Sequence, residues 1–185
     1  QSPSSAASDV YKRQASDTAP NNFEYPEPII KEKYKIVFYN GHYQNHLTFL
    51  PDSITIMSNL EYHSDPVNKI MEPSSSPFDI LNTAFMDSGI CLKVENNKEI
   101  HEPILMMFIN SGNDRLMTAP RFHIRLGRSS SLELFEHHVG YQVGNFSNTS
   151  IFISLQENSF FKHTRLQMDS GCAINTGNIL SLIHI

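Results

Sequence analysis

Short segments in which apolar and polar residues alternate dominate the chain after Gly89. An alternation with a period of two is typical of β-strands that bury one face. Polar, loosely ordered stretches such as NNK, GRSSS and QENS separate these segments. The predicted strands are Tyr34–Tyr39, Ile54–Met57, Gly89–Glu95, Pro103–Ile109, Arg121–Gly127, Ser131–His137, Ser150–Gln156, Ser159–Met168 and a segment that starts at Ala173.

One helix is expected among these strands, at about residues 77–86. Ser76 is a favourable N-cap, Pro77 suits the first helical position, and Asp79 places an acid in the first turn. Apolar residues then follow at helical spacing, which predicts that one apolar face packs inward. These residues are Ile80, Leu81, Ala84 and Phe85.

The turns between the strands distinguish two mainly β architectures. A β-sandwich or a cupin-like fold joins neighbouring strands through tight hairpins, for which Asn-Gly and Asp-Gly are the strongest signals. Neither dipeptide occurs after Gly89. Loose polar corners instead favour a parallel β-helix, a solenoid of stacked coils. The sequence therefore predicts a β-helix with a small α/β N-terminal portion, and the β-sandwich or cupin-like fold remains the alternative.

The two ends of the chain resemble translated adapter sequence. Ser4–Gln14 reads SSAASDVYKRQ, and Leu180–Ile185 reads LSLIHI. They match readings, in complementary senses, of the adapter used in transposase-based preparation of DNA libraries. We therefore expect residues 1–14 and 180–185 to be non-native and excluded from fold reasoning. Between them we expect a linker at 15–33, the N-terminal α/β portion at 34–88, and a truncated β-helix core at 89–179.

Composition excludes several classes of partner. Without the three charged residues of the adapter-like ends, 14 basic and 19 acidic side chains become 12 and 18, a net charge of −6. A mildly acidic chain is a poor match for nucleic acid. The longest apolar run is too short to cross a bilayer. Cys91 and Cys172 have no CxxC spacing, which favours buried thiols in a reducing compartment.

Histidines are the strongest candidates in this sequence for metal-binding or catalytic residues. Glu136-His137-His138 resembles a metal-binding cluster, but adjacent residues of a strand point to opposite faces. His123 and His163 could approach one another only in a folded β structure. The sequence contains no GxSxG, P-loop, GxGxxG or HExxH motif. The isolated acids Asp87, Asp114 and Asp169 fit turns better than a catalytic pair. We therefore predict no catalytic, cofactor-binding or metal-binding residue, and no enzyme.

Two spaced motifs occur in the middle of the chain. The first combines an N-x-A-F helix with the following G-x-x-x-x-V and P-I segments, here at Asn82–Phe85, Gly89–Val94 and Pro103-Ile104. The second reads R-x-x-I-x-L-G-x-x-S-x-L-x-L-x-E, here at Arg121–Glu136. Both motifs resemble those of the SufB/SufD family of iron–sulfur cluster assembly scaffolds, and the resemblance covers roughly residues 34–179. His137 and His138 stand where SufB proteins typically carry a glycine-cysteine pair, so the chain is more similar to SufD.

The resemblance implies a right-handed parallel β-helix in a cytoplasmic complex. It implies a non-catalytic scaffold that pairs with a SufB-like scaffold and a SufC-like ATPase, with the cluster assembled by the full complex. The functional residues of the family lie beyond Ile179, so none is carried over. Two other classes stay open. A metal- or sugar-binding cupin-type domain would hold stoichiometric metal, and a secreted adhesive or carbohydrate-active solenoid would follow a signal peptide.

Overall fold

A computed structural model describes residues 19, 33–58, 76–86, 88–111, 116–140, 144–169 and 173–184. Residues 1–14, most of the expected linker, Asp87, Asp114 and Cys172 lie outside this part. The chain is mainly β, as predicted, with one α-helix in the described residues. Its elements are β1 (Tyr34–Tyr39), β2 (His42–Tyr43), the short helix η1 (Asn45–Leu47), β3 (Ile54–Ser58), α3 (Pro77–Phe85), β4 (Gly89–Val94), β5 (Ile104–Asn110), β6 (Met117–Thr118), β7 (Arg121–Leu126), β8 (Ser131–Gly140), β9 (Phe146–Leu155), β10 (Phe160–Asp169) and β11 (Ile174–Ile183).

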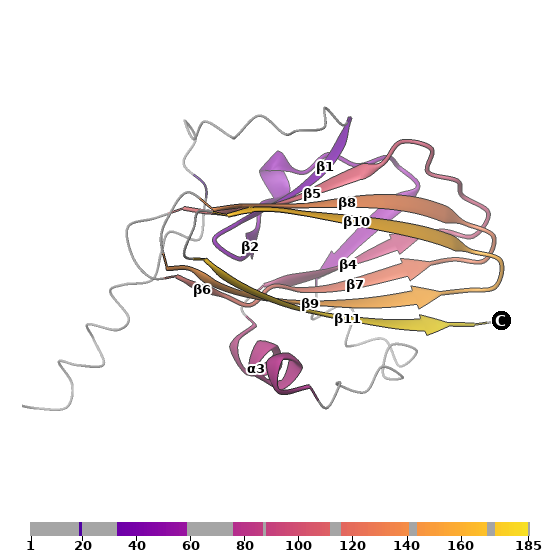
Figure 1. The fold of residues 1–185 in the computed structure, drawn as a ribbon. Helices are drawn as coiled ribbons and strands as arrows, with labels where there is room; N and C mark the ends of the chain where they lie inside the picture. Colours follow the sequence, from indigo (N-terminus) through magenta and orange to yellow (C-terminus); the bar gives the residue numbers. More distant parts are fainter. Residues whose placement is uncertain are drawn as a thin grey trace, which may run out of the picture.

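The strands form two mixed sheets that lie one above the other (Figure 1). The first sheet has the order β10-β8-β5-β1-β2, and the second has the order β11-β9-β7-β4-β3, with β6 beside β9. Helix α3 lies on the outer side of the second sheet (Figure 1). The predicted division into portions 34–88 and 89–179 stays a prediction, and strands from both portions share the two sheets.

From β4 onward the main strands alternate between the sheets, and each main strand after β4 pairs in parallel with the main strand that preceded it in its own sheet. The second sheet grows through the pairs β4–β7, β7–β9 and β9–β11. The first sheet grows through β5–β8 and β8–β10. The prediction of mainly parallel strands after Gly89 is confirmed. Antiparallel strand pairs among the described residues are β1–β2 and β3–β4.

Similar turns join the second sheet to the first at one end of the molecule (right in Figure 1). Asn97, Ser129 and Asn158 each adopt a positive φ in the left-handed region, at 58°, 52° and 57°. The turns stack through backbone bonds, because the Asn97 N–H donates to the Arg128 carbonyl and the Ser129 N–H donates to the Glu157 carbonyl. The loose polar stretches of the sequence are therefore stacked corners rather than hairpins.

The core lies between the facing sides of the two sheets. Alternate residues of each strand point into it, including Phe38 of β1, Phe108 of β5 and Phe122 of β7. These three rings are in mutual contact, with centroids 4.8–5.3 Å apart. A second apolar cluster, which includes Val37 and Met107, covers the outer face of the first sheet. Strand β5 is thus buried on both faces, which explains its continuous apolar run.

Helix α3 has the predicted position, but the prediction that its apolar face packs inward is wrong. Asp79 and Asn82 are fully buried, whereas Phe78, Ile80 and Phe85 are 47%, 58% and 55% exposed. The physical reason is that the helix rests on polar residues of the outer face of the second sheet. Polar groups buried there need partners, and the polar side of the helix supplies them.

Arg121 of β7 is the centre of this polar contact. Its Nη2 donates to Asp79 Oδ1 at 3.2 Å, and its Nε donates to Asn82 Oδ1 at 2.8 Å. Ser150 Oγ of β9 donates to Asp79 Oδ1 at 2.8 Å. The Asn82 amide donates to the backbone carbonyls of Pro120 and Asn148. The helix is therefore held by an ion pair and hydrogen bonds.

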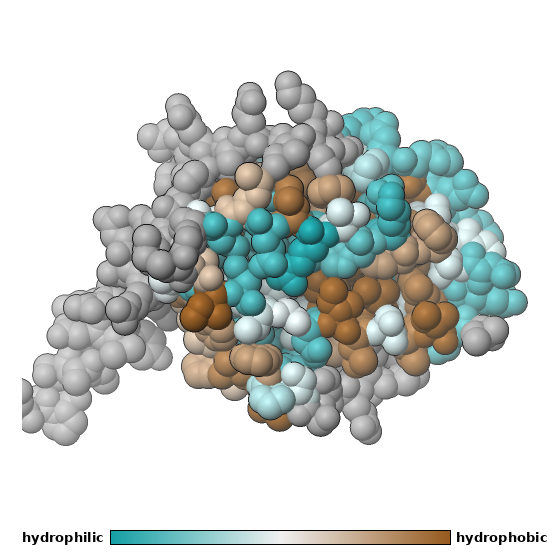
Figure 2. Space-filling model, in the orientation of Figure 1, coloured by the Kyte–Doolittle hydropathy of each residue, from teal (hydrophilic) through white to brown (hydrophobic). Residues whose placement is uncertain are grey.

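The last strands leave an apolar surface. Figure 2 shows hydrophilic side chains along β10 and a hydrophobic area over the right-hand half of β11. The exposed apolar residues of β11 include Ile174, Ile179 and Ile183. Residues 180–183, which resemble adapter sequence, continue this edge strand in register with β9. Any alternating apolar segment can extend an open strand edge, so their strand geometry carries no information on their origin.

Candidate functional site

Four polar residues meet inside the apolar space between the sheets. Glu136 and His138 come from β8, and His163 and Arg165 come from the neighbouring strand β10. They lie on the inner face because they continue the alternation of Leu132 and Leu134, which belong to the core. We call this group the Glu136 cluster. It combines one carboxylate with three groups that can donate hydrogen bonds to it.

The contacts within the Glu136 cluster are short. His138 Nε2 lies 2.5 Å from Glu136 Oε1, and His163 Nε2 lies 2.8 Å from Glu136 Oε2. Arg165 Nε lies 3.5 Å from Glu136 Oε1. Glu136 and His138 are fully buried, while the side chains of His163 and Arg165 are 14% and 23% exposed. The cluster therefore extends from the buried strand β8 to the edge strand β10.

These contacts keep Glu136 ionised. Burial alone would raise the pKa of its carboxyl group, but hydrogen bonds from His138 and His163 and the charges of His138 and Arg165 outweigh burial. The result is a pKa lowered from 4.5 to about 2. Because an ionised carboxylate only accepts hydrogen bonds, both Nε2 atoms must carry the donated proton. In the neutral form of His138, the remaining lone pair is therefore on Nδ1.

Apart from its Nε2 atom, which faces Glu136, the ring of His138 lies in apolar surroundings. Its ring stacks on Phe108 of β5 with centroids 4.5 Å apart. Its Nδ1 is buried and has no hydrogen-bond partner in the described part of the chain. Through the contacts of Glu136 with His138 and His163, the cluster ties β8 to β10.

The geometry does not resemble a metal centre. Both imidazole Nε2 atoms face the carboxylate oxygens, so their lone pairs do not converge on a common point. Among the residues that the structure describes, no group of three or more His, Cys, Asp or Glu side chains is arranged to hold a metal ion. The prediction that the histidines bind no metal stays a prediction.

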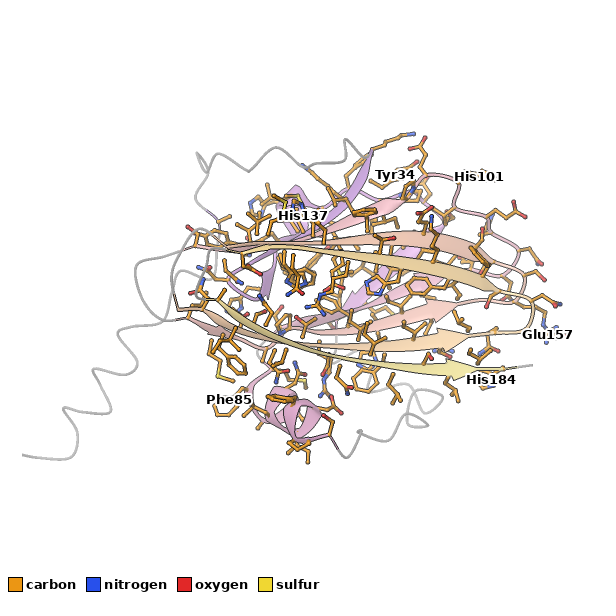
Figure 3. All side chains as sticks on the ribbon, viewed as in Figure 1. Tyr34, Phe85, His101, His137, Glu157 and His184 are labelled. Carbon is orange, nitrogen blue, oxygen red and sulfur yellow. The ribbon has the colours of Figure 1, made fainter. Side chains whose placement is uncertain are left out.

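The structure separates the other candidate histidines. His137 follows Glu136 on the first sheet (Figure 3), and burial together with the charge of His138 lowers its pKa. His123 lies on β7 in the second sheet, where its ring stacks on Phe152 with centroids 5.1 Å apart. His123 and His163 are therefore not brought together. Asp169 ends β10, where it accepts a hydrogen bond from the Asn175 amide rather than joining another acid.

The sequence did contain a signal for the Glu136 cluster. Glu136-x-His138 and His163-x-Arg165 each place two polar residues two positions apart, hence on one face of a strand. Both pairs interrupt an otherwise apolar face. Cys91, by contrast, is buried as predicted, and burial raises the pKa of its thiol to about 12.

A scan against protein-family models gives no match for this chain, and a search of curated proteins gives none either. Within the part of the chain that the structure describes, none of the helices has the length and apolar character needed to cross a membrane.

Proposed function

We propose that this chain is a segment of a non-catalytic scaffold subunit of the SUF iron–sulfur cluster assembly system, similar to SufD. In this proposal the subunit is cytoplasmic and pairs with a SufB-like scaffold and a SufC-like ATPase. The segment itself holds no cofactor. The iron–sulfur cluster is the product of the full complex and not a resident group of this segment.

The observation that carries the proposal is the role of the residues that form the second family motif. Arg121 anchors helix α3 through Asp79 and Asn82. Gly127 lies where a Cβ would be only 2.6 Å from the backbone nitrogen of Asn96, so the motif glycine permits two turns to stack. Ser130 Oγ donates to the Gly127 carbonyl at 2.7 Å, which fixes the same corner.

The remaining motif residues also have structural roles. Ile124, Leu126, Leu132 and Leu134 are core residues, and Glu136 begins the buried polar cluster. A motif that supports coil stacking and helix docking, without converging on an opening, fits a scaffold better than an enzyme. This agrees with a resemblance that rests on structural motifs.

The path of the strands supports a parallel β-helix as the architecture. Strands alternate between two sheets and pair in parallel with the preceding coil, and left-handed residues recur at stacked corners. Ser159 Oγ repeats in the next coil the bond of Ser130, because it donates to the Gln156 carbonyl at 2.6 Å. Each coil then covers its neighbour, as in solenoid proteins. The right hand of the coil follows from the family resemblance and from the known preference of parallel crossovers.

Co-purification of the full-length protein with its partners tests the proposal. The gene that encodes this chain would be recovered in full and co-expressed with the SufB-like and SufC-like proteins of the same source. We expect a stoichiometric complex that carries an iron–sulfur cluster after reconstitution. Absence of any complex, or an equivalent of metal held by this protein alone and lost on Glu136→Gln, would refute the scaffold function and favour a cupin-type domain.

A further inference from the structure

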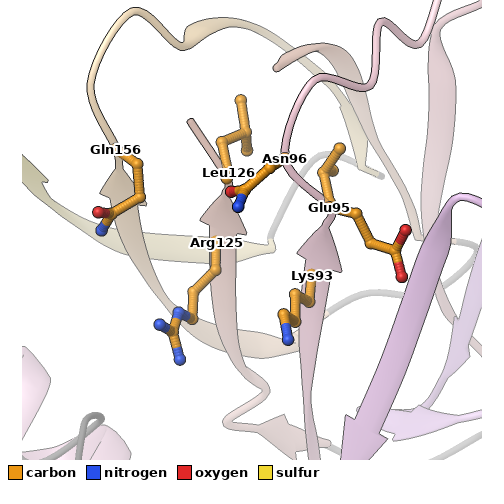
Figure 4. A pocket seen from close by; sticks show the side chains of 8 residues that line it. Lys93, Glu95, Asn96, Arg125, Leu126 and Gln156 are labelled. Atoms are coloured by element: carbon orange, nitrogen blue, oxygen red, sulfur yellow. The ribbon is translucent and has the colours of Figure 1, made fainter. Parts of the chain in front are cut away.

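The space between the two sheets is apolar near the stacked corners and polar at its other end. Near the corners, the charged residues Lys93 and Arg125 lie on the outer face, beside the hollow shown in Figure 4. The inward residues next to them, Val94 and Leu126, belong to the apolar core. At the other end, polar residues and glycine take inward positions. They include Arg165 of β10, Thr149 of β9, and Asn175 and Gly177 of β11.

The inward direction of the residues on the second sheet follows from strand alternation and register. Thr149 precedes the core residue Ile151 by two positions on β9, so the two residues share a face. In the parallel pair β9–β11, Gly177 is opposite Thr149. Asn175 precedes Gly177 by two positions and lies on the same face. Thr149 and Asn175 are therefore both neighbours of Gly177 on the inner face of the second sheet.

Arg165 reaches from the first sheet to the second. Its Nε lies 3.5 Å from Glu136 Oε1 on β8. A Cβ added to Gly177 of β11 would collide with Arg165 Nη1, so the guanidinium group occupies the space that the glycine leaves open. Thr149 and Asn175 flank this position on the second sheet. A guanidinium group, a hydroxyl group and an amide group thus meet at one glycine.

Two of these groups have a buried atom without a hydrogen-bond partner among the described residues. The atoms are Thr149 Oγ1 and Asn175 Oδ1. Thr149 is 1% exposed, so bulk solvent does not reach its hydroxyl group. The Asn175 amide nitrogen donates to Asp169 Oδ2 at 2.5 Å, which identifies Oδ1 as the acceptor atom on the other side of the amide. Buried polar atoms of native proteins nearly always bond to protein or to ordered water, because an unmade hydrogen bond leaves the cost of desolvation uncompensated.

We propose that an ordered water molecule lies beside Gly177 and bridges Thr149, Asn175 and Arg165. The chemistry of the three groups selects water over an ion. Asn175 Oδ1 only accepts, the guanidinium group only donates, and the hydroxyl group does both, as water does. An anion would face the acceptor Asn175 Oδ1, and a cation would face the charge of Arg165. The water joins the Glu136 cluster to the second sheet, and its presence does not depend on the function proposed above.

Oxygen-17 magnetic relaxation dispersion of the 185-residue chain tests this inference, because it counts water molecules that stay in the protein for longer than its rotational tumbling. Thr149→Val keeps the shape of the side chain and removes the hydroxyl group. Thr149→Ser keeps the hydroxyl group. The matched control is Thr164→Val, which removes a hydroxyl group from the outer face of β10, where Thr164 is opposite Phe135. The urea midpoint of each variant is a second readout.

We expect the unmodified chain, Thr149→Ser and Thr164→Val to hold the same number of long-lived water molecules, and Thr149→Val to hold one fewer. Asn175→Ala removes the second contact and should lower the count in the same way. The urea midpoint of Thr149→Val should fall. A hydroxyl group without any partner predicts the opposite sign, since a methyl group in its place removes a desolvation penalty. A raised midpoint, an unchanged water count in Thr149→Val, or an equal loss of water in Thr149→Ser or Thr164→Val would overturn the inference.

Discussion

Replacement of Glu136 by glutamine is the sharpest test of the buried cluster. Glutamine has nearly the same shape, so the change leaves no cavity between the sheets. It removes the negative charge that His138, His163 and Arg165 surround. The amide oxygen of the glutamine still accepts a hydrogen bond from one histidine. The amide NH₂ then faces the Nε2–H of the other histidine, His138 or His163, which is also a donor. Arg165 then keeps a largely buried charge without its carboxylate.

The size of the effect follows from the lowered pKa of Glu136 and from the cost of leaving a buried charge unpaired. A pKa lowered from 4.5 to about 2 corresponds to about 3 kcal/mol of differential stabilisation of the ionised carboxylate. Removing one partner of a buried ion pair costs roughly 3 to 5 kcal/mol. We therefore expect Glu136→Gln to lower the free energy of unfolding by about 3 kcal/mol at neutral pH. This is a large part of the roughly 5 to 15 kcal/mol that stabilises a typical domain.

The loss of stability in Glu136→Gln should depend on pH. The folded-state pKa of Glu136 is depressed below the ordinary value of 4.5. Its stabilising contribution is thus fully present above pH 4.5, and it is lost as the pH falls towards 2. Urea denaturation, followed by circular dichroism at several pH values between 7 and 2.5, measures this contribution. The difference between the unmodified chain and Glu136→Gln should shrink steadily over the acidic part of the range.

Glu133→Gln is the matched control on the same strand. Glu133 lies on the outer face, where its carboxylate is 2.7 Å from the exposed ammonium of Lys162. Exposed ion pairs contribute about 0 to 1 kcal/mol, so this variant should be nearly neutral. Equal effects of the two substitutions, or a difference for Glu136→Gln that does not change between pH 6 and 3, would refute the buried-cluster reasoning.

Three further substitutions address the stacked corners and the helix anchor, all measured by chemical denaturation. Gly127→Ala should lower the free energy of unfolding by roughly 1 to 3 kcal/mol, because the added Cβ would meet the backbone of the neighbouring turn at 2.6 Å. Arg121→Met should lower it by roughly 3 to 5 kcal/mol, because it removes the buried guanidinium that pairs with the Asp79 carboxylate. Ser129→Gly should raise it by up to about 1 kcal/mol, because the φ of 52° at this position suits glycine.

For each of these three substitutions, a different result or a control variant tests the physical reason given. A neutral Gly127→Ala would mean that the corners have room to separate. Recovery of stability when Asp79→Leu is added to Arg121→Met is expected, since the buried negative charge then disappears; an additive further loss would contradict the ion-pair argument. Ser130→Gly is the control for Ser129→Gly. It removes the side-chain bond to Gly127 and should destabilise by about 1 kcal/mol.

The strands could be predicted because their alternation is a local property. Residues 121–126 alternate between core and outer face, as the sequence indicates. The parallel pairing could be predicted from the missing hairpin dipeptides. The orientation of α3 could not be predicted from its own apolar residues. It depends on Arg121, Asn148 and Ser150, which reach the helix from strands far away in the chain. An apolar helix face packs inward only when the surface beneath it is apolar.

The candidate site needed information that a single strand does not contain. The opposite directions of His137 and His138 follow from strand geometry alone. The meeting of Glu136 with His163 and Arg165 requires the register between β8 and β10, in which Glu136 is opposite Arg165. That register depends on the length of the corner between β9 and β10 and on the path of the chain from β8 to β10. The sequence marks the polar positions, but only the parallel pairing of β8 with β10 brings them together.

The buried charges explain how the neighbouring strands β8 and β10 keep that register. In a parallel ladder of apolar side chains, a shift by two residues would exchange one aliphatic contact for another and keep the same face inward. The contact between Glu136 and Arg165 does not allow this exchange, since such a shift would place Glu136 opposite His163 or Gln167 and bury the guanidinium beside Leu134 or His138. A buried charge without its partner costs several kcal/mol, far more than a changed aliphatic contact. The cluster thus contributes less to net stability than to the choice of one alignment.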